Sequence, residues 1–167
     1  YSLGLKSDGT IYAWGRNLYG QIGDGTTGTD RLTPVQVVGP DGTGYFKGAV
    51  KVVASASHSH ALKTDGTVWS WGANSFGQMG DNTEDTDRLY PVQVTGVGGS
   101  GQLEDVIDIS AGANHGLAVK NDGTVWAWGL NSAGQLGDNS TTQRNAPVQV
   151  EDGEQVTTSG YLENVVA

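Results

Sequence analysis

The stretch Asp65-Gly66-Thr67-Val68-Trp69-Ser70-Trp71-Gly72 has close copies at residues 8–15 and 122–129, so the spacing is 57 residues each time (8 to 65 to 122). A fixed period of this length is typical of a protein built from repeated supersecondary units. In each copy an Asp-Gly pair precedes a run of β-branched and aromatic residues, and glycine tolerates the positive φ that a tight hairpin turn requires. The sequence therefore predicts a hairpin turn and then a strand in every unit.

The two tryptophans of this stretch lie two residues apart on the predicted strand and share one face, with Val68 and Ser70 on the other. Because both faces carry apolar or small groups, we expect sheets that stack face to face, with the aromatic side chains in the core. The expected core aromatics are Tyr12, Trp14, Trp69, Trp71, Trp126 and Trp128. The expected turn glycines are Gly9, Gly15, Gly66, Gly72, Gly123 and Gly129.

The strand before each hairpin turn keeps one face small, as shown by Gly4, Ala61 and Ala118 at equivalent positions. Protein interiors are densely packed, so a large side chain must cover these positions. We expect a tryptophan of an adjacent sheet to do so.

Each complete unit contains four strand-like segments and no helical periodicity. In the middle unit these segments are residues 50–55, 58–63, 67–72 and the short Pro-Val-Gln-Val run at 91–94. Proline cannot donate to a sheet ladder, so the last segment belongs at a strand start or at an outer edge. The pattern predicts an all-β protein, a β-propeller made of four-stranded antiparallel blades.

The repeat units are approximately residues 1–49, which lack a first strand, 50–105 and 106–164, with the start of another unit at 165–167. We expect residues 1–167 to be one propeller segment, an open arc of about three blades from a larger propeller. An open arc leaves unpaired blade edges, which are templates for association. We therefore expect the isolated chain to self-associate, with residues 165–167 adding as a strand to the edge at residues 1–6.

The composition excludes several classes of protein. The 9 Lys and Arg against 18 Asp and Glu give a net charge of −9, which repels phosphate backbones and argues against direct nucleic-acid binding. With no cysteine there is neither a disulfide framework nor a thiolate zinc site. No apolar run approaches the roughly 18 residues of a spanning helix, so membrane insertion is not expected. The 27 glycines with only 4 prolines indicate many tight turns.

Candidate catalytic and metal-binding residues all have a simpler structural explanation. His58 and His115 occupy one repeat position, which suggests packing between blades, and His60 stands in a leucine column. The carboxylates of residues 81–87 lack the glycine and the closing glutamate of a calcium-binding loop. The aspartate of each Asp-Gly turn is too far from its copies to form a general acid and base pair. We expect no catalytic residue, no metal and no cofactor.

In order along the middle unit, the motifs are His-x-x-Ala-Leu (58–62), Asp-Gly-Thr-Val-Trp-x-Trp-Gly-x-Asn (65–74), Gly-Gln-x-Gly-Asp (77–81) and Pro-Val-Gln-Val (91–94). This order, recurring along essentially the whole chain, resembles the regulator of chromosome condensation repeat family. The resemblance implies a propeller, usually of seven blades. The long loops and the 57-residue period look more like bacterial members.

The chain departs from the family pattern at two positions. Ser55 stands where Gly112 holds the family's glycine, and Tyr1 replaces the histidine found at His58 and His115. These departures indicate that the contacts at these two positions differ from blade to blade.

The resemblance implies a non-enzymatic interaction scaffold that binds a protein partner through its variable loops, residues 25–33, 82–90 and 139–146. The candidate contact residues in these loops are Asp30, Arg31, Asp85, Asp87, Arg88 and Arg144. One alternative is the founder's nucleotide exchange on a small GTPase, although the founder's specific loops and basic tail have no match here. Another is a secreted enzyme inhibitor or cell-surface binding protein. An extracellular or cell-surface location in a bacterium is favoured, with the cytoplasm as the alternative.

Overall fold

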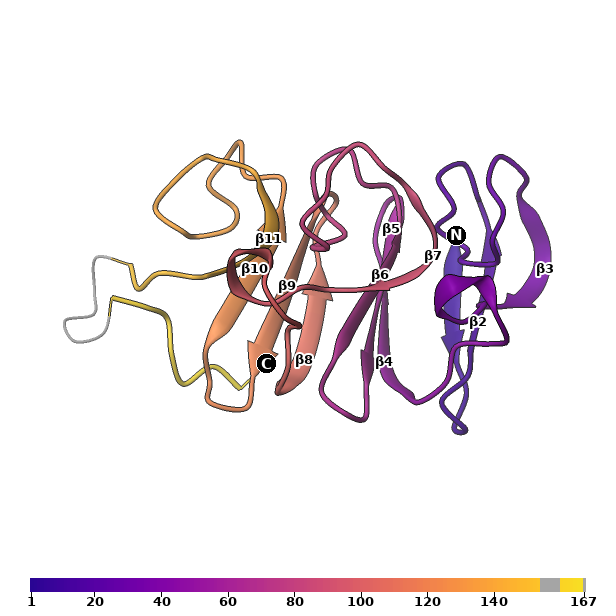
Figure 1. Cartoon of the computed structure of the whole chain (residues 1–167), viewed down its shortest axis with the longest axis horizontal. Helices are drawn as coiled ribbons and strands as arrows, with labels where there is room; N and C mark the ends of the chain where they lie inside the picture. Colours follow the sequence, from indigo (N-terminus) through magenta and orange to yellow (C-terminus); the bar gives the residue numbers. More distant parts are fainter. Residues whose placement is uncertain (154–159, 167) are drawn as a thin grey trace.

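The computed structural model describes residues 1–153 and 160–166, and these residues form three antiparallel sheets that follow one another along the chain (Figure 1). The first blade is β1 (Ser2–Leu5), β2 (Ile11–Gly15) and β3 (Arg31–Gln36). The second blade is β4 (Ala49–Ala54), β5 (His58–Lys63), β6 (Val68–Gly72) and β7 (Arg88–Gln93). The third blade is β8 (Val106–Ala111), β9 (His115–Lys120), β10 (Val125–Gly129) and β11 (Arg144–Gln149).

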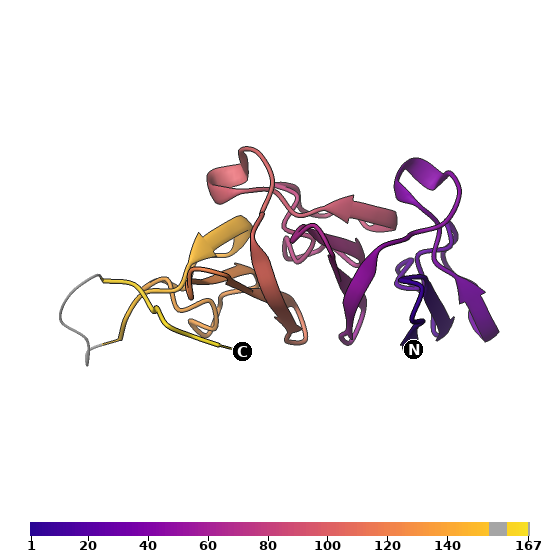
Figure 2. The ribbon, with the colours of Figure 1, turned by 90° about the horizontal axis from the view of Figure 1, so that it is seen from below.

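The predicted fold class is confirmed. Each blade is a simple meander, with strand order β1-β2-β3, β4-β5-β6-β7 and β8-β9-β10-β11, and the three sheets stand side by side (Figure 2). The two linkers between the blades each contain one short 3-10 turn: η1 (Pro40–Gly42) and η2 (Val97–Gly99). Positive φ at Asp41 and at Gly98 keeps these turns from continuing as helices.

The Asp-Gly segments are hairpin turns whose aspartate serves the turn itself. In the second blade Asp65 Oδ1 accepts hydrogen bonds from the amide and the hydroxyl of Thr67, at 3.1 and 2.6 Å. Gly66 has φ of 77° and its amide donates to the carbonyl of Lys63. The other predicted turn glycines also have positive φ: Gly9, Gly15, Gly72, Gly123 and Gly129.

The outer strands begin earlier than the sequence predicted. Pro34 is the fourth residue of β3 and Pro91 the fourth of β7, because both strands already start at an arginine. The pairing register shifts between Ala13 and Gly15 on the neighbouring strand, which leaves the proline in a bulge. The edge position was therefore the correct one of the two expected for proline, since a missing N–H is tolerated on an edge strand or at a bulge.

The predicted aromatic core is only partly right. Trp71 and Trp128 have no exposed surface, whereas the other four predicted core aromatics, Tyr12, Trp14, Trp69 and Trp126, are half-buried. The half-buried indoles of the second and third blades donate their N–H to Thr67 and Thr124 at the start of the same strand segment. In the second and third blades, the second tryptophan of the strand is therefore the one that fills the space between blades.

The residue that covers the small positions comes from the same sheet, which corrects the expectation of an adjacent sheet. Trp128 lies directly opposite Gly116 on β9, and a Cβ added to Gly116 would lie 2.5 Å from the indole. In the first blade, a Cβ added to Gly4 would lie 3.3 Å from the indole of Trp14, which lies diagonally across the strand pair because Gly4 itself pairs with Tyr12. Cross-strand neighbours are close enough for a large side chain on one strand to cover a small residue on the other.

The buried tryptophans then reach the preceding blade. Trp71 Nε1 donates to the carbonyl of Gln21 at 2.9 Å, and Trp128 Nε1 donates to the carbonyl of Gln78 at 3.0 Å. A glycine two residues later, Gly23 or Gly80, leaves room for the indole, since a Cβ there would approach it to 2.7 or 2.8 Å. The Gly-Gln-x-Gly segments of the first two blades thus each form a socket, here called the glycine socket, for a tryptophan of the next blade.

The second blade differs from the others by a buried polar pair. His60 Nδ1 and Ser70 Oγ lie 2.7 Å apart on opposite strands, and both residues are fully buried. The equivalent cross-strand pairs in the other blades are apolar: Leu3 with Ala13 and Leu117 with Ala127. The His60 ring also packs edge-on against Trp128 with centroids 5.5 Å apart, so the pair lies at the interface of the second and third blades.

We expect this interface to be sensitive to acid. Burial lowers the pKa of His60 well below its usual value, and burial followed by the charge of His115 lowers the pKa of His58 to about 3. The folded protein binds these two rings in their neutral form, whereas a histidine in the unfolded chain takes up a proton below its pKa of about 6.5. The free energy of unfolding therefore falls as the pH drops below about 6.5. The loss is about 1.4 kcal/mol per pH unit for each histidine, hence roughly 2 kcal/mol by pH 5.

The double variant His60→Leu/Ser70→Ala, which installs the pair of the other blades, should lose less stability on acidification than the parent chain. Urea melts at pH 7 and pH 5 measure the difference. Ser70→Ala alone is the control and should keep the acid sensitivity. An unchanged pH dependence in the double variant would contradict the assignment.

Candidate partner-binding loop face

In every blade a long connection joins the tryptophan strand to the outer strand, at residues 16–30, 73–87 and 130–143. All three connections lie on the same side of the molecule, opposite the Asp-Gly hairpins (Figure 1). We call this side the loop face. It contains the variable segments that the sequence predicted to contact a partner.

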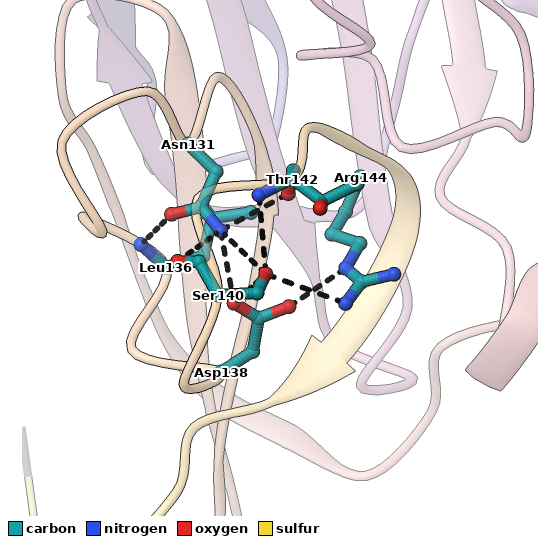
Figure 3. Close-up of polar contacts among 6 residues, drawn as sticks. All are labelled: Asn131, Leu136, Asp138, Ser140, Thr142 and Arg144. Carbon is teal, nitrogen blue, oxygen red and sulfur yellow. Dashed lines mark hydrogen bonds and ion pairs between the residues drawn. The ribbon is translucent and has the colours of Figure 1, made fainter.

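A buried asparagine holds each connection in shape, as the third blade shows (Figure 3). Asn131 Nδ2 donates to Asp138 Oδ1 at 2.9 Å and to the carbonyls of Ser140 and Thr142 at 3.1 and 3.0 Å. Its Oδ1 accepts the amide of Leu136 at 3.0 Å. Asn17 and Asn74, also fully buried, make equivalent bonds in the other blades; each donates to a threonine and accepts the amide of the buried apolar residue.

An ion pair closes each connection. The aspartate of the Gly-Gln-x-Gly-Asp motif binds the arginine that begins the outer strand, in the pairs Asp24–Arg31, Asp81–Arg88 and Asp138–Arg144, at 2.5, 2.5 and 2.7 Å. The aspartate side chains are 6 to 9% exposed and the arginines 28 to 37%, so the pairs lie at the base of the loops. Burial alone would raise the pKa of Asp24, but the hydrogen bonds from Thr26 and Arg31 outweigh it and lower the pKa.

Most of the predicted contact residues make bonds that hold the base of the loops, the frame formed by the buried asparagines and the ion pairs. Arg31, Arg88 and Arg144 are held by the ion pairs. Asp30 Oδ1 and Asp87 Oδ1 accept the backbone amides of the framing asparagines at 3.0 Å. Of the six, Asp85 is an exposed residue with positive φ and without such a bond among the described residues. A partner contact at any of the six residues stays a prediction.

Sequence reasoning missed both the framing asparagines and the exposed aromatics of the loop face. An asparagine recurs two residues after the strand glycine in all three units, and this recurrence was the available signal. Tyr19 and Phe76 occupy equivalent positions in the first two loops and are 37 and 36% exposed, beside Leu18 at 45%. The third loop has Ala133 there, so only an alignment of the units combined with exposure identifies the position.

The histidines considered for metal binding make packing and hydrogen-bond contacts within and between the blades. His58 Nδ1 lies 2.8 Å from Ser55 Oγ, and in the next unit a Cβ at Gly112 would lie 2.0 Å from His115, so this position packs against the histidine of its own blade. Tyr1, which replaces the histidine in the first blade, donates its hydroxyl to the carbonyl of His58. In residues 1–153 and 160–166, no three His, Cys, Asp or Glu side chains are grouped as a metal site would require.

Among the described residues, no helix has the length and apolar character needed to cross a membrane.

The chain matches the profile described as the regulator of chromosome condensation (RCC1) repeat at residues 8–62, 65–119 and 122–160, and a second RCC1 repeat profile at residues 49–78 and 106–135. It is 32% identical over 150 residues to the human probable E3 ubiquitin-protein ligase HERC4, covering 90% of this chain and 13% of that protein. It is 29% identical over 199 residues to the Arabidopsis thaliana ultraviolet-B receptor UVR8, covering 90% of this chain and 44% of that protein. These relatives are eukaryotic, so the expected bacterial source stays a prediction.

Solved structures share the fold at low sequence identity. Human WBSCR16 superposes with a TM-score of 0.72 at 22% identity, covering 88% of this chain and 34% of that one. Prp20p of Saccharomyces cerevisiae superposes with a TM-score of 0.71 at 21% identity, covering 90% of this chain and 36% of that one. The chain thus spans less than half of each of these relatives.

The framing asparagine can be tested in the third loop. Asn131→Ala removes the hydrogen bonds of the Asn131 side chain and leaves the buried amide of Leu136 without its acceptor. Each buried group left unsatisfied costs about 1 to 3 kcal/mol of folding stability. We expect a lower denaturation midpoint and amide exchange at Leu136 at least tenfold faster. Asn121→Thr, which installs the Thr64 of the second blade at an exposed turn, is the control and should change neither. Unchanged exchange at Leu136 in Asn131→Ala would show that the asparagine does not hold the loop.

Proposed function

Because the chain belongs to the regulator of chromosome condensation (RCC1) repeat family, we propose that it is a non-enzymatic protein-interaction module whose loop face binds a basic segment of a protein partner. The observation that carries this proposal is the division of each loop into a fixed frame and an exposed tip. Buried asparagines and ion pairs fix the base of all three loops. A loop that is already ordered loses little conformational entropy on binding, which favours affinity.

The exposed aromatics supply apolar anchors on this face. Tyr19 and Phe76 stand at equivalent positions in adjacent loops, and each backbone amide donates to the side chain of a buried glutamine, at 2.9 and 2.8 Å. Aromatic side chains on a rigid backbone are the residues that most often dominate the binding energy of a protein interface.

The charge of the tips indicates the chemistry of the partner. The three arginines that begin the outer strands are held in ion pairs, and Arg16 on the first loop is exposed. Against this one positive charge, Glu84, Asp85 and Asp87 are exposed on the second loop. Together with the net charge of −9, these carboxylates favour a positively charged partner by electrostatic steering.

The relatives agree with this class of function. The structure of Prp20p is described together with its binding properties to Gsp1p and histones, and another structure shows yeast RCC1 bound to Kap60. Histones are basic proteins and match the charge of the loop face. No described residue favours the two alternative functions, nucleotide exchange on a small GTPase and inhibition of a secreted enzyme. An extracellular or cell-surface location also stays a proposal.

Core histones are the probe for this proposal, with binding to the immobilised chain measured by interferometry at several salt concentrations. We expect binding that weakens as salt rises, at least tenfold weaker binding in Tyr19→Ser/Phe76→Ser, and a slower on-rate in Glu84→Gln/Asp85→Asn. The charge-matched control is Glu104→Gln/Glu163→Gln, which removes two exposed carboxylates of the linkers beside the hairpins. Equal losses in this control and in the loop-face variants, or no binding by the parent chain, would overturn the proposal.

A further inference from the structure

The linker that contains η1 meets the outer strand β7 on the rim of the first two blades (Figure 2). A pocket of about 480 Å³ lies between them, here called the rim pocket. Its lining includes Pro40, Asp41, Trp69, Asp87, Tyr90 and Pro91. The volume is within the range of pockets that hold a ligand. Elements of the first two blades form both of its walls.

Two aromatic rings of the rim pocket are fixed by packing. Trp69 lies edge-on against Phe46, with ring centroids 5.8 Å apart. Tyr90 lies over two glycines of the first blade, since a Cβ at Gly25 or at Gly42 would approach its ring to 2.6 or 2.9 Å. Trp69 is nevertheless only half-buried, and Tyr90 is 37% exposed. The rings are therefore ordered and accessible, which lowers the entropy cost of binding a ligand.

The unpaired charges of the rim pocket are negative. Arg88 lines the pocket, but its guanidinium is bound to Asp81. Asp41 and Asp87 are exposed and form no ion pair within the part of the chain that the structure describes. Ring faces attract cations, and carboxylates form short hydrogen bonds with cationic N–H groups. The pocket thus has the chemistry of a site for an organic cation.

The equivalent place between the second and third blades lacks this chemistry. Trp126 occupies the position of Trp69 there, and its N–H donates to Thr124 as that of Trp69 donates to Thr67. The other positions differ: Asp41, Asp87 and Tyr90 are replaced by Gly98, Gln143 and Ala146. The repeated fold therefore does not by itself require the tyrosine or the two carboxylates.

A glycine makes room for the tyrosine ring. Gly25 and Asn82 are equivalent, since their amides donate to the carbonyls of Leu89 and Asn145 on the next outer strand. At the second interface the Asn82 side chain packs on the linker, where a Cβ at Gly99 would lie 2.5 Å from it. At the first interface the ring of Tyr90 takes this place. The rim pocket thus depends on two coupled positions, a glycine in the loop and a tyrosine on the outer strand.

The two half-buried indoles also differ in where a neighbouring lysine lies. Lys63 Nζ is 5.7 Å from the ring centroid of Trp69 and 3.4 Å from Asp65, and it does not line the rim pocket. The equivalent Lys120 lines the hollow of about 460 Å³ beside Trp126. A cationic ligand is therefore repelled by this lysine in the third blade, whereas the rim pocket is free of such a charge.

We propose that the rim pocket binds the guanidinium group of an arginine side chain from a peptide partner. The guanidinium packs on the exposed parts of Trp69 and Tyr90, and Asp41 and Asp87 accept its N–H groups. Arginine suits this site better than lysine, because its planar and weakly hydrated group both stacks on rings and pairs with carboxylates. The inference rests on the proposed function in that the loop at 73–87 leads into β7, so a basic segment on the loop face reaches the pocket.

The peptide acetyl-Gly-Arg-Gly-amide is the probe, titrated into the isotopically labelled 167-residue chain and followed by nuclear magnetic resonance. We expect a saturable shift of the Trp69 indole N–H and no shift of the Trp126 indole N–H, which is the internal control. A peptide with citrulline, which has the shape of arginine without its charge, should bind about tenfold more weakly, and a lysine peptide should also bind more weakly. A dilute sample is used, because self-association through residues 165–167 stays a prediction; Ala167 lies outside the described residues.

Two variants test the walls of the rim pocket. Tyr90→Ala installs the residue of the third blade, and Asp41→Asn/Asp87→Asn removes both charges but keeps a side-chain oxygen for the amide of Asn74. We expect each variant to bind the arginine peptide about tenfold more weakly. Glu104→Gln/Glu163→Gln removes two charges outside the pocket and should bind as the parent chain does. Far-ultraviolet circular dichroism checks the sheets, and the Asp→Asn variant decides the test if Tyr90→Ala unfolds.

Absence of a saturable shift at Trp69, an equal shift at Trp126, or equal binding of the citrulline or lysine peptide would overturn the proposal. So would undiminished binding in Asp41→Asn/Asp87→Asn. The loop face and the rim pocket can fail separately. Histone binding that depends on Tyr19 and Phe76, with no peptide in the rim pocket, would strike only the pocket. Peptide binding without histone binding would strike only the loop face.

Discussion

The architecture depends on a tryptophan that belongs to two blades at once. Trp128 covers Gly116 on its own sheet and enters the glycine socket of the preceding blade, where its N–H binds a carbonyl. Burial of an aromatic side chain of about 150 to 250 Å² contributes on the order of 4 to 6 kcal/mol before the entropy cost. A buried indole N–H without an acceptor would forfeit part of this energy. The position of one blade therefore fixes the loop conformation of its neighbour.

This constraint explains why the base of each loop has nearly the same residues in all three units, whereas the tips differ. The socket requires its glycines, and the buried asparagine and the Asp–Arg pair keep the socket carbonyl in place. Other loop positions are free of this requirement, and Tyr19, Phe76 and Asp85 are exposed residues at positions that differ between the units. The same geometry that stacks the blades thus provides an ordered support for a binding surface.

Much of the fold was predictable because period and strand alternation are properties of the sequence alone. The Asp-Gly hairpins and the four-stranded blades both follow from the repeated pattern. The pattern does not distinguish Trp69 from Trp71, since burial depends on which strand position meets the next blade. Nor does it show that Arg88 binds Asp81, because ion pairs across a loop depend on its closed conformation. The loop arginines therefore looked like free contact residues.

The most direct test of the tryptophan socket compares Gly80→Ala with Gly137→Ala by chemical denaturation, at a concentration where the chain is monomeric. Both glycines have positive φ, 66° and 64°, and both lie near a valine of the following segment, so the backbone strain of roughly 1 kcal/mol is shared. Only Gly80 faces an indole, with Trp128 at 2.8 Å from an added Cβ. The tryptophan socket predicts that Gly80→Ala loses about 2 kcal/mol more stability than Gly137→Ala. Equal losses would contradict it.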